Sequence, residues 1–85
     1  MVFLATRKTQ TLTKRDINIL KSIGANVKAE RERQKLDVYD ITGDDCLIKS
    51  RQHWQAIENG KKNINLTTLF KVAETLKVHP SKLLG

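Results

Sequence analysis

Apolar residues recur every three or four positions along most of the chain, and no long stretch alternates between apolar and polar residues. Between residues 14 and 35 the recurring positions are Ile17, Leu20, Ile23, Gly24 and Val27. This spacing places them on one face of an amphipathic helix. Thr13 is a typical N-cap, and Asp16 follows where a negative charge favours the start of a helix. The pattern therefore predicts a helix over residues 14–35.

Glycine inside a helix costs about 1 kcal/mol relative to alanine. Gly24 therefore predicts that a neighbouring helix comes close to the long helix at this position. Asp37 is the expected N-cap of a short helix over residues 38–45, for which Gly43 offers an earlier end, and Ser50 is the expected N-cap of a third helix over residues 51–58. The pair Asn59-Gly60 then provides a stop signal.

The last part of the chain predicts two more helices. Asn65 is an N-cap, and an apolar stripe follows it at Leu66, Leu69, Phe70, Ala73 and Leu76. His79-Pro80 starts a short fifth helix, because proline is tolerated at the beginning of a helix. The predicted fold class is all-α, with one five-helix domain over residues 13–85. Residues 1–12 are expected to form a flexible N-terminal arm, whose Arg7 and Lys8 suit contact with a groove of DNA.

Composition restricts the classes of function. The chain of 85 residues has room for one domain, and its net charge of +7 with a pI near 9.9 predicts a polyanionic partner. A single cysteine, Cys46, excludes an internal disulfide and a zinc site of the usual multi-cysteine kind. Cys46, His53 and His79 have no companion ligands at metal-binding spacing. We therefore expect no metal, no cofactor and no enzymatic activity, in a small cytoplasmic protein with no membrane segment.

The charges are unevenly distributed along the chain. Residues 1–35 carry a net charge of +6 and residues 49–62 a net charge of +3, whereas residues 36–48 carry −4. The acidic side chains of that middle segment are Asp37, Asp40, Asp44 and Asp45. An anionic partner is expected to contact the two basic segments and to avoid the acidic segment between them.

Residues 50–59 hold the best candidate for a binding surface. On a helical wheel Trp54 and Ile57 point to one side, towards the core, and the opposite side is rich in amides. This outer face lacks the Glu and Lys residues of an ordinary surface helix and has Arg51 at its start. Gln can pair with adenine and Arg with guanine in the major groove, and Ala fits beside a thymine methyl group. The segment is therefore typical of a helix that reads DNA bases.

A resemblance extends over about 60 residues, from Ile23 to Leu84. The residues that carry it are Ile23, Gly24, Val27, Lys28 and Arg31, then Ser50, Arg51 and Gln52, the run Ile57-Glu58-Asn59-Gly60-Lys61-Lys62-Asn63, and Leu66, Thr68, Leu69, Ala73, Leu76, Val78, Pro80, Leu83 and Leu84. With these residues the chain resembles the phage repressor/Cro-type, XRE-like helix-turn-helix transcriptional regulators. The resemblance implies a lambda-repressor-like domain with its helix-turn-helix at about residues 38–58.

The resemblance also implies roles for individual residues. The implied base-reading residues are Arg51, Gln52, Gln55 and Ala56. The implied phosphate-contacting residues are Ser50, Lys61, Lys62 and Asn63. Arg31 and Glu58 match positions that form a salt bridge between the first and third helices.

The second helix departs from the family pattern. It usually opens with a Gln or a similar group that touches a phosphate, but this chain has Asp37-Val38-Tyr39-Asp40 there. The stretch from Ile41 to Glu58 is also longer than the common pattern. Tyr39 has two interpretations, as a donor to one phosphate or as a packing side chain.

The expected function is sequence-specific binding of duplex DNA by a transcriptional regulator. Such proteins commonly act as homodimers on two-fold sites, and the candidate dimer surfaces are Leu83, Leu84, the exposed side of the fourth helix and the N-terminal arm. Two alternatives remain: a protein-interaction module of the same fold, such as an antitoxin or adaptor, and an RNA-associated basic protein. Salt dependence and competition by RNA distinguish them from a DNA-binding regulator.

Overall fold

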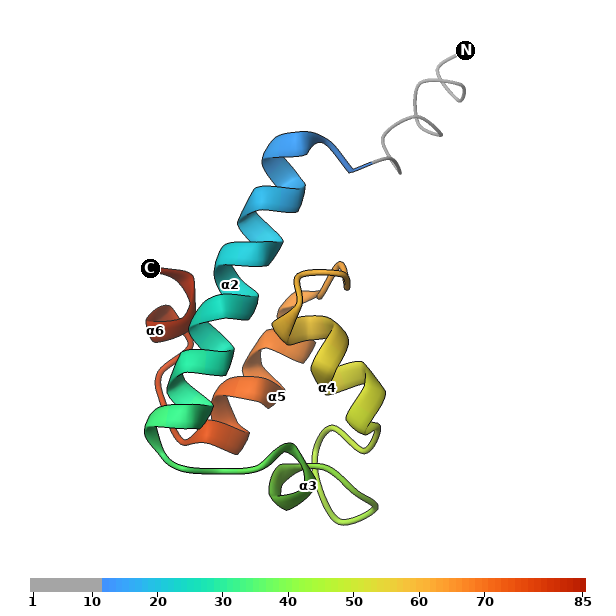
Figure 1. Cartoon of the computed structure of the whole chain (residues 1–85), viewed down its shortest axis with the longest axis vertical. Helices are drawn as coiled ribbons and strands as arrows, with labels where there is room; N and C mark the ends of the chain where they lie inside the picture. Colours follow the sequence, from blue (N-terminus) through green and yellow to red (C-terminus); the bar gives the residue numbers. More distant parts are fainter. Residues whose placement is uncertain (1–11) are drawn as a thin grey trace.

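A computed structural model describes residues 12–85, which form five helices and no strand. The helices are α2 (Lys14–Arg33), α3 (Val38–Ile41), α4 (Arg51–Glu58), α5 (Leu66–Leu76) and α6 (Ser81–Leu84), as Figure 1 shows. The predicted all-α, five-helix architecture is confirmed. The predicted N-terminal arm lies outside the described residues except for Leu12.

The long helix α2 begins with the predicted cap. The backbone N–H of Asp16 donates to Thr13 Oγ1 (3.1 Å), and the N–H of Thr13 donates back to Asp16 Oδ2 (3.1 Å), which is a capping box. The helix ends at Arg33, so the predicted end at residue 35 is two residues late. Lys35 adopts a left-handed conformation with φ of 61°, and this turns the chain out of the helix.

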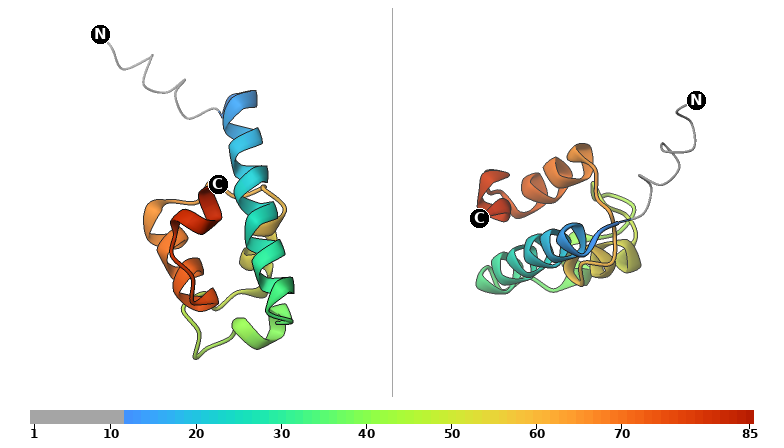
Figure 2. Two further views of the ribbon diagram at one scale, coloured as in Figure 1. Left: turned by 90° about the vertical axis from the view of Figure 1, so that its left-hand side faces the viewer. Right: turned by 90° about the horizontal axis from the view of Figure 1, so that it is seen from above.

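Helix α2 lies at the centre of the domain. Figure 2 shows α5 and α6 on one side of it and α4 on another. The most deeply buried side chains come from α2, α4, α5 and α6 and are Val27, Trp54, Ile57, Val72, Leu76 and Leu83. The close approach predicted at Gly24 is confirmed, since a Cβ atom there would lie 2.5 Å from the carbonyl oxygen of Glu58.

Helix α3 is much shorter than predicted. It ends at Ile41, so the prediction of a helix over residues 38–45 was wrong. Thr42 has an extended backbone, and its hydroxyl donates to the carbonyl oxygen of Val38 (2.8 Å). Gly43 follows with φ of 133°, a conformation that L side chains rarely adopt and that cannot continue a helix. The loop that leads to α4 is held against the core by the buried side chain of Ile48.

Several predicted core positions are exposed instead. Ile17 is 38% exposed, because the first turns of α2 extend beyond the other helices (Figure 1). Leu66 and Phe70 of α5 are 69% and 48% exposed, and Val72 takes the core position beside Leu69. Leu83 was a candidate dimer residue, but it is fully buried and cannot form an intermolecular surface.

One acidic residue, Glu30, is buried near the end of α2. Its Oε2 accepts hydrogen bonds from Arg33 Nε (3.0 Å) and from Gln34 Nε2 (2.9 Å), and Gln34 also donates to the carbonyl oxygen of Leu76 (2.7 Å). These side-chain hydrogen bonds, first that of Arg33 and then that of Gln34, lower the pKa of Glu30 from 4.5 to about 2. The ionised carboxylate therefore links the end of α2 to the end of α5.

The lowered pKa of Glu30 predicts a loss of stability in acid. Because the pKa is lower in the folded state than in the unfolded state, the ionised carboxylate stabilises the fold above about pH 4.5, and this contribution disappears as the pH falls towards 2. We expect the melting temperature, measured by circular dichroism, to fall over this range. A Glu30→Gln variant should show a shallower fall. An equally steep fall in that variant would mean that other carboxylates cause the acid sensitivity.

Candidate nucleic-acid interface

Helix α4 is oriented by its cap and by its apolar side. The backbone N–H of His53 donates to Ser50 Oγ (3.1 Å), which starts the helix at Arg51. Trp54 and Ile57 are buried in the core. Arg51, Gln52 and Gln55 are exposed, and Ala56 is half-buried. The amides of α4 therefore face away from the protein.

A Schellman motif ends α4 and determines where the basic loop begins. The N–H of Gly60 donates to the carbonyl oxygen of Ile57 (3.1 Å), and the N–H of Lys61 donates to that of Ala56 (2.9 Å). Gly60 has φ of 71° and packs so closely on α2 that a Cβ atom would lie 2.7 Å from the Cα atom of Lys21. The sharp turn leaves Lys61, Lys62 and Asn63 exposed immediately after α4.

Arg31 and Glu58 join α2 to α4. Arg31 Nε donates to Glu58 Oε2 (2.7 Å) and Arg31 Nη2 donates to Glu58 Oε1 (3.2 Å), so the pair is bidentate. Arg31 Nη1 donates to the carbonyl oxygen of Leu36 (2.8 Å), and the indole Nε1 of Trp54 donates to Glu58 Oε2 (2.7 Å). The hydrogen bond to Glu58 raises the pKa of Arg31. The network fixes α4 on α2 and removes the acidic side chain of α4 from its outer face.

Two neighbours of α4, Tyr39 and Lys28, lie outside the set of implied base-reading and phosphate-contacting residues, although one interpretation of Tyr39 makes it a donor to a phosphate. Tyr39 of α3 is 68% exposed, so it is not a core side chain, and the guanidinium carbon of Arg51 lies 4.2 Å from the centre of its ring. Lys28 of α2 lines a small hollow together with Gln55 and Asn59. Lys28 was already a mark of the resemblance, but the Tyr39 contact depends on how α3 sits against α4, which sequence spacing does not reveal.

The acidic segment of residues 37–45 precedes α4 and leads to its N-terminal end, where Arg51 begins the helix. At the start of α3 the carboxylates of Asp37 and Asp40 accept from backbone N–H groups: Asp37 Oδ1 from Tyr39 (3.0 Å) and Asp40 Oδ2 from Asp37 (2.9 Å). Asp44 and Asp45 are exposed in the following loop. Their negative charges oppose contact between this loop and phosphates.

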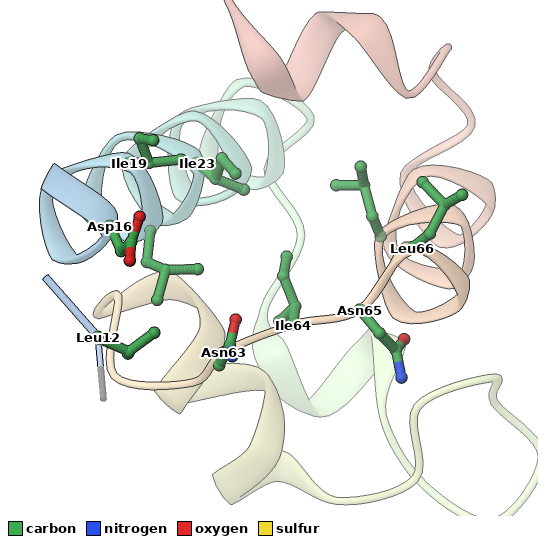
Figure 3. A pocket seen from close by; sticks show the side chains of 10 residues that line it. Leu12, Asp16, Ile19, Ile23, Asn63, Ile64, Asn65 and Leu66 are labelled. Atoms are coloured by element: carbon green, nitrogen blue, oxygen red, sulfur yellow. The ribbon is translucent and has the colours of Figure 1, made fainter. Parts of the chain in front are cut away.

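A hollow of about 480 Å³ opens between the start of α2 and the segment that leads into α5. Figure 3 shows Ile19 and Ile23 on its α2 side and Asn63, Ile64 and Leu66 on its other side. Apolar side chains line it together with the polar side chains of Asp16, Asn63 and Asn65. The hollow adjoins the basic loop but includes none of the exposed side chains of α4.

The structure offers no cluster of metal ligands within residues 12–85, where no three His, Cys, Asp or Glu side chains come close enough together to hold an ion. The imidazole of His79 instead accepts a hydrogen bond from the backbone N–H of Ser81 (3.2 Å). Among the helices of this same region, none has both the length and the apolar character needed to cross a bilayer.

Comparison with known proteins identifies a family for the chain but no individual relative. Neither a curated protein nor a solved structure matches it. The family model described as Helix-turn-helix matches residues 27–83, which is more than half of the chain and includes α3, α4, α5 and most of α6. The chain therefore belongs to the helix-turn-helix family of DNA-binding regulators of the XRE and lambda-repressor type.

Proposed function

We propose that the protein binds specific sequences in duplex DNA, with α4 in the major groove, and thereby regulates transcription. The observation that carries this proposal is the outer face of α4. Arg51, Gln52 and Gln55 are exposed there, while the single acidic residue of the helix, Glu58, is held in the ion pair with Arg31. Bidentate pairing of Gln with adenine and of Arg with guanine requires such free side chains. Half-buried Ala56 leaves room for a base edge.

The proposed phosphate contacts lie at both ends of α4. Lys61, Lys62 and Asn63 are exposed in the loop after the helix. Ser50 uses its oxygen to accept from His53, and its hydroxyl hydrogen remains able to donate to a phosphate oxygen. Contacts of this kind set the register of a protein on DNA without reading its sequence.

A homodimer is the assembly that we propose on DNA. Two-fold sites place the recognition helices of two protomers about 34–36 Å apart, one turn of the double helix. The exposed apolar side chains available for self-association include Leu66 and Phe70 on α5, and Leu84 in α6. Leu66 and Phe70 are four residues apart on one helix and therefore share a face that a second protomer could cover.

Selection of bound duplexes from a random pool tests the proposal. We expect enrichment of a palindromic sequence whose half-site centres are separated by about 10 base pairs. Failure to enrich any sequence would contradict specific binding, and enrichment of an isolated half-site would contradict the dimer. If structured RNA displaces the duplex, the protein is an RNA-binding protein instead. If its affinity for duplex DNA does not change with salt, a protein-interaction module is favoured.

Two substitutions separate base reading from phosphate contact. Gln52→Ala is expected to weaken binding to the selected site roughly tenfold, about 1.4 kcal/mol, and to leave non-specific binding nearly unchanged. Lys62→Ala, the matched control, should weaken binding to all sequences alike and lower the salt slope. Fluorescence anisotropy with labelled duplexes at several salt concentrations measures both effects. Equal losses on every sequence from Gln52→Ala would show that this side chain does not read bases.

A further inference from the structure

We infer that Tyr39 is a positioning residue that holds the Arg51 side chain ready to read a guanine, so that α3 contributes to base specificity without touching a base. This inference rests on the proposed function. It assigns a role to the start of α3, where Asp37-Val38-Tyr39-Asp40 stands in place of the Gln or similar group expected from the resemblance.

The first step is the geometry of the contact. Arg51 is the first residue of α4, and its guanidinium carbon lies 4.2 Å from the centre of the Tyr39 ring, within the distance of a cation–π interaction. Both side chains are exposed, so the pair lies on the surface rather than in the core. The contact thus joins the exposed ends of two different helices.

The second step is the rigidity of the platform under Arg51. Helix α3 is held to the core by Val38 and Ile41, which are both buried on either side of Tyr39. The N-cap Asp37 accepts the backbone N–H of Tyr39 (3.0 Å), which fixes the start of the helix. A ring carried by this anchored turn restricts the rotamers of a long arginine side chain that otherwise samples many conformations in water.

The third step concerns the donors of Arg51. A cation–π contact uses the charge of the guanidinium group and leaves its N–H groups available in the plane. Within residues 12–85 the Arg51 side chain makes no hydrogen bond and no salt bridge. The carboxylates of Asp37 and Asp40 are engaged by backbone N–H groups of α3. Arg51 therefore keeps the free donor edge that pairs with guanine O6 and N7.

The test is a double-mutant cycle between Tyr39 and Arg51, measured on the selected duplex and on a duplex in which the guanine read by Arg51 is replaced. Tyr39→Leu removes the aromatic face, and Tyr39→Phe keeps the face but removes the hydroxyl group. We expect Tyr39→Leu to weaken binding to the selected site by about two- to fivefold and to reduce the preference for guanine at that position. Tyr39→Phe should bind like the original chain. In an Arg51→Ala background, Tyr39→Leu should have no further effect.

Other outcomes would overturn the inference. If Tyr39→Phe loses as much affinity as Tyr39→Leu, and loses it on every sequence, then the hydroxyl group donates to a phosphate instead. If Tyr39→Leu costs the same with and without Arg51, the two residues act independently. If Tyr39→Leu lowers the melting temperature and weakens binding to every sequence alike, the ring has a structural role and does not position Arg51. If Arg51→Ala and Gln52→Ala both leave specific binding intact, the proposed function itself fails.

Discussion

Replacing Glu58 by alanine is expected to lower the free energy of unfolding by about 3–4 kcal/mol. The side chains of Arg31 and Glu58 are only 13% and 6% exposed, so the substitution leaves a nearly buried guanidinium group without its partner. Breaking one half of a buried pair is costly because the remaining charge is still desolvated. The substitution also removes the acceptor of the Trp54 indole N–H.

Urea unfolding of the original and variant chains measures this effect. Glu58→Gln is the matched control, because it preserves an oxygen acceptor of the same length but removes the charge, and we expect it to cost clearly less than Glu58→Ala. A loss below about 1 kcal/mol for Glu58→Ala would place the pair among ordinary surface salt bridges. It would also remove the argument that this ion pair fixes the orientation of α4.

The second large effect is expected from Gly24→Ala. Alanine has a higher helix propensity than glycine, which favours the substitution by about 1 kcal/mol. The added Cβ atom would however lie 2.5 Å from the carbonyl oxygen of Glu58, and backbone of α4 cannot move aside as a flexible side chain can. Overpacking costs about 1–3 kcal/mol and more where the neighbour is rigid. We therefore expect a net loss of about 1–2 kcal/mol in the free energy of unfolding.

The neighbouring residue provides the control for Gly24→Ala. Ala25 is exposed on the same helix, so Ala25→Gly reports the helix propensity alone and should cost about 1 kcal/mol. Thermal or urea unfolding of both variants gives the comparison. If Gly24→Ala stabilises the chain, then propensity outweighs packing and α4 does not approach α2 as closely as the structure describes.

Local signals were sufficient to predict the helices that form the candidate site. Ser50 and Asn65 are true N-caps, since Ser50 Oγ accepts from His53 and Asn65 Oδ1 accepts from Thr68. Gly60 adopts the positive φ that ends α4 as predicted. These residues act through hydrogen bonds to their immediate neighbours, which is why sequence alone could locate α4 and α5.

The errors arose where the structure depends on distant contacts or on an unusual residue at a helix end. Lys35 takes the left-handed conformation that is normally filled by glycine, so no stop signal was visible for α2. The apolar periodicity of Ile17, Leu66 and Phe70 is correct for a helix, but the rest of residues 12–85 leaves these side chains partly exposed. Periodicity predicts a face, and only tertiary packing determines how far along the helix that face is buried.

The candidate site was predictable to a similar extent. The outward face of α4 followed from the helical wheel, because Trp54 and Ile57 had to be buried. The Arg31–Glu58 ion pair was implied by the resemblance, and the structure contains it. The contact between Tyr39 and Arg51 could not be predicted, since the loop between α3 and α4 determines which side chains of the two helices meet.

The burial of Trp54 gives the chain an internal optical probe. It is the only tryptophan in the sequence, it has no exposed surface, and its indole N–H is bonded to Glu58. Its emission will therefore shift to longer wavelength when the domain unfolds and water reaches the ring. Because the ring faces inward while the amides of α4 face outward, we expect a duplex bound as proposed to leave its surroundings unchanged. Tryptophan emission should then report folding alone, with or without DNA.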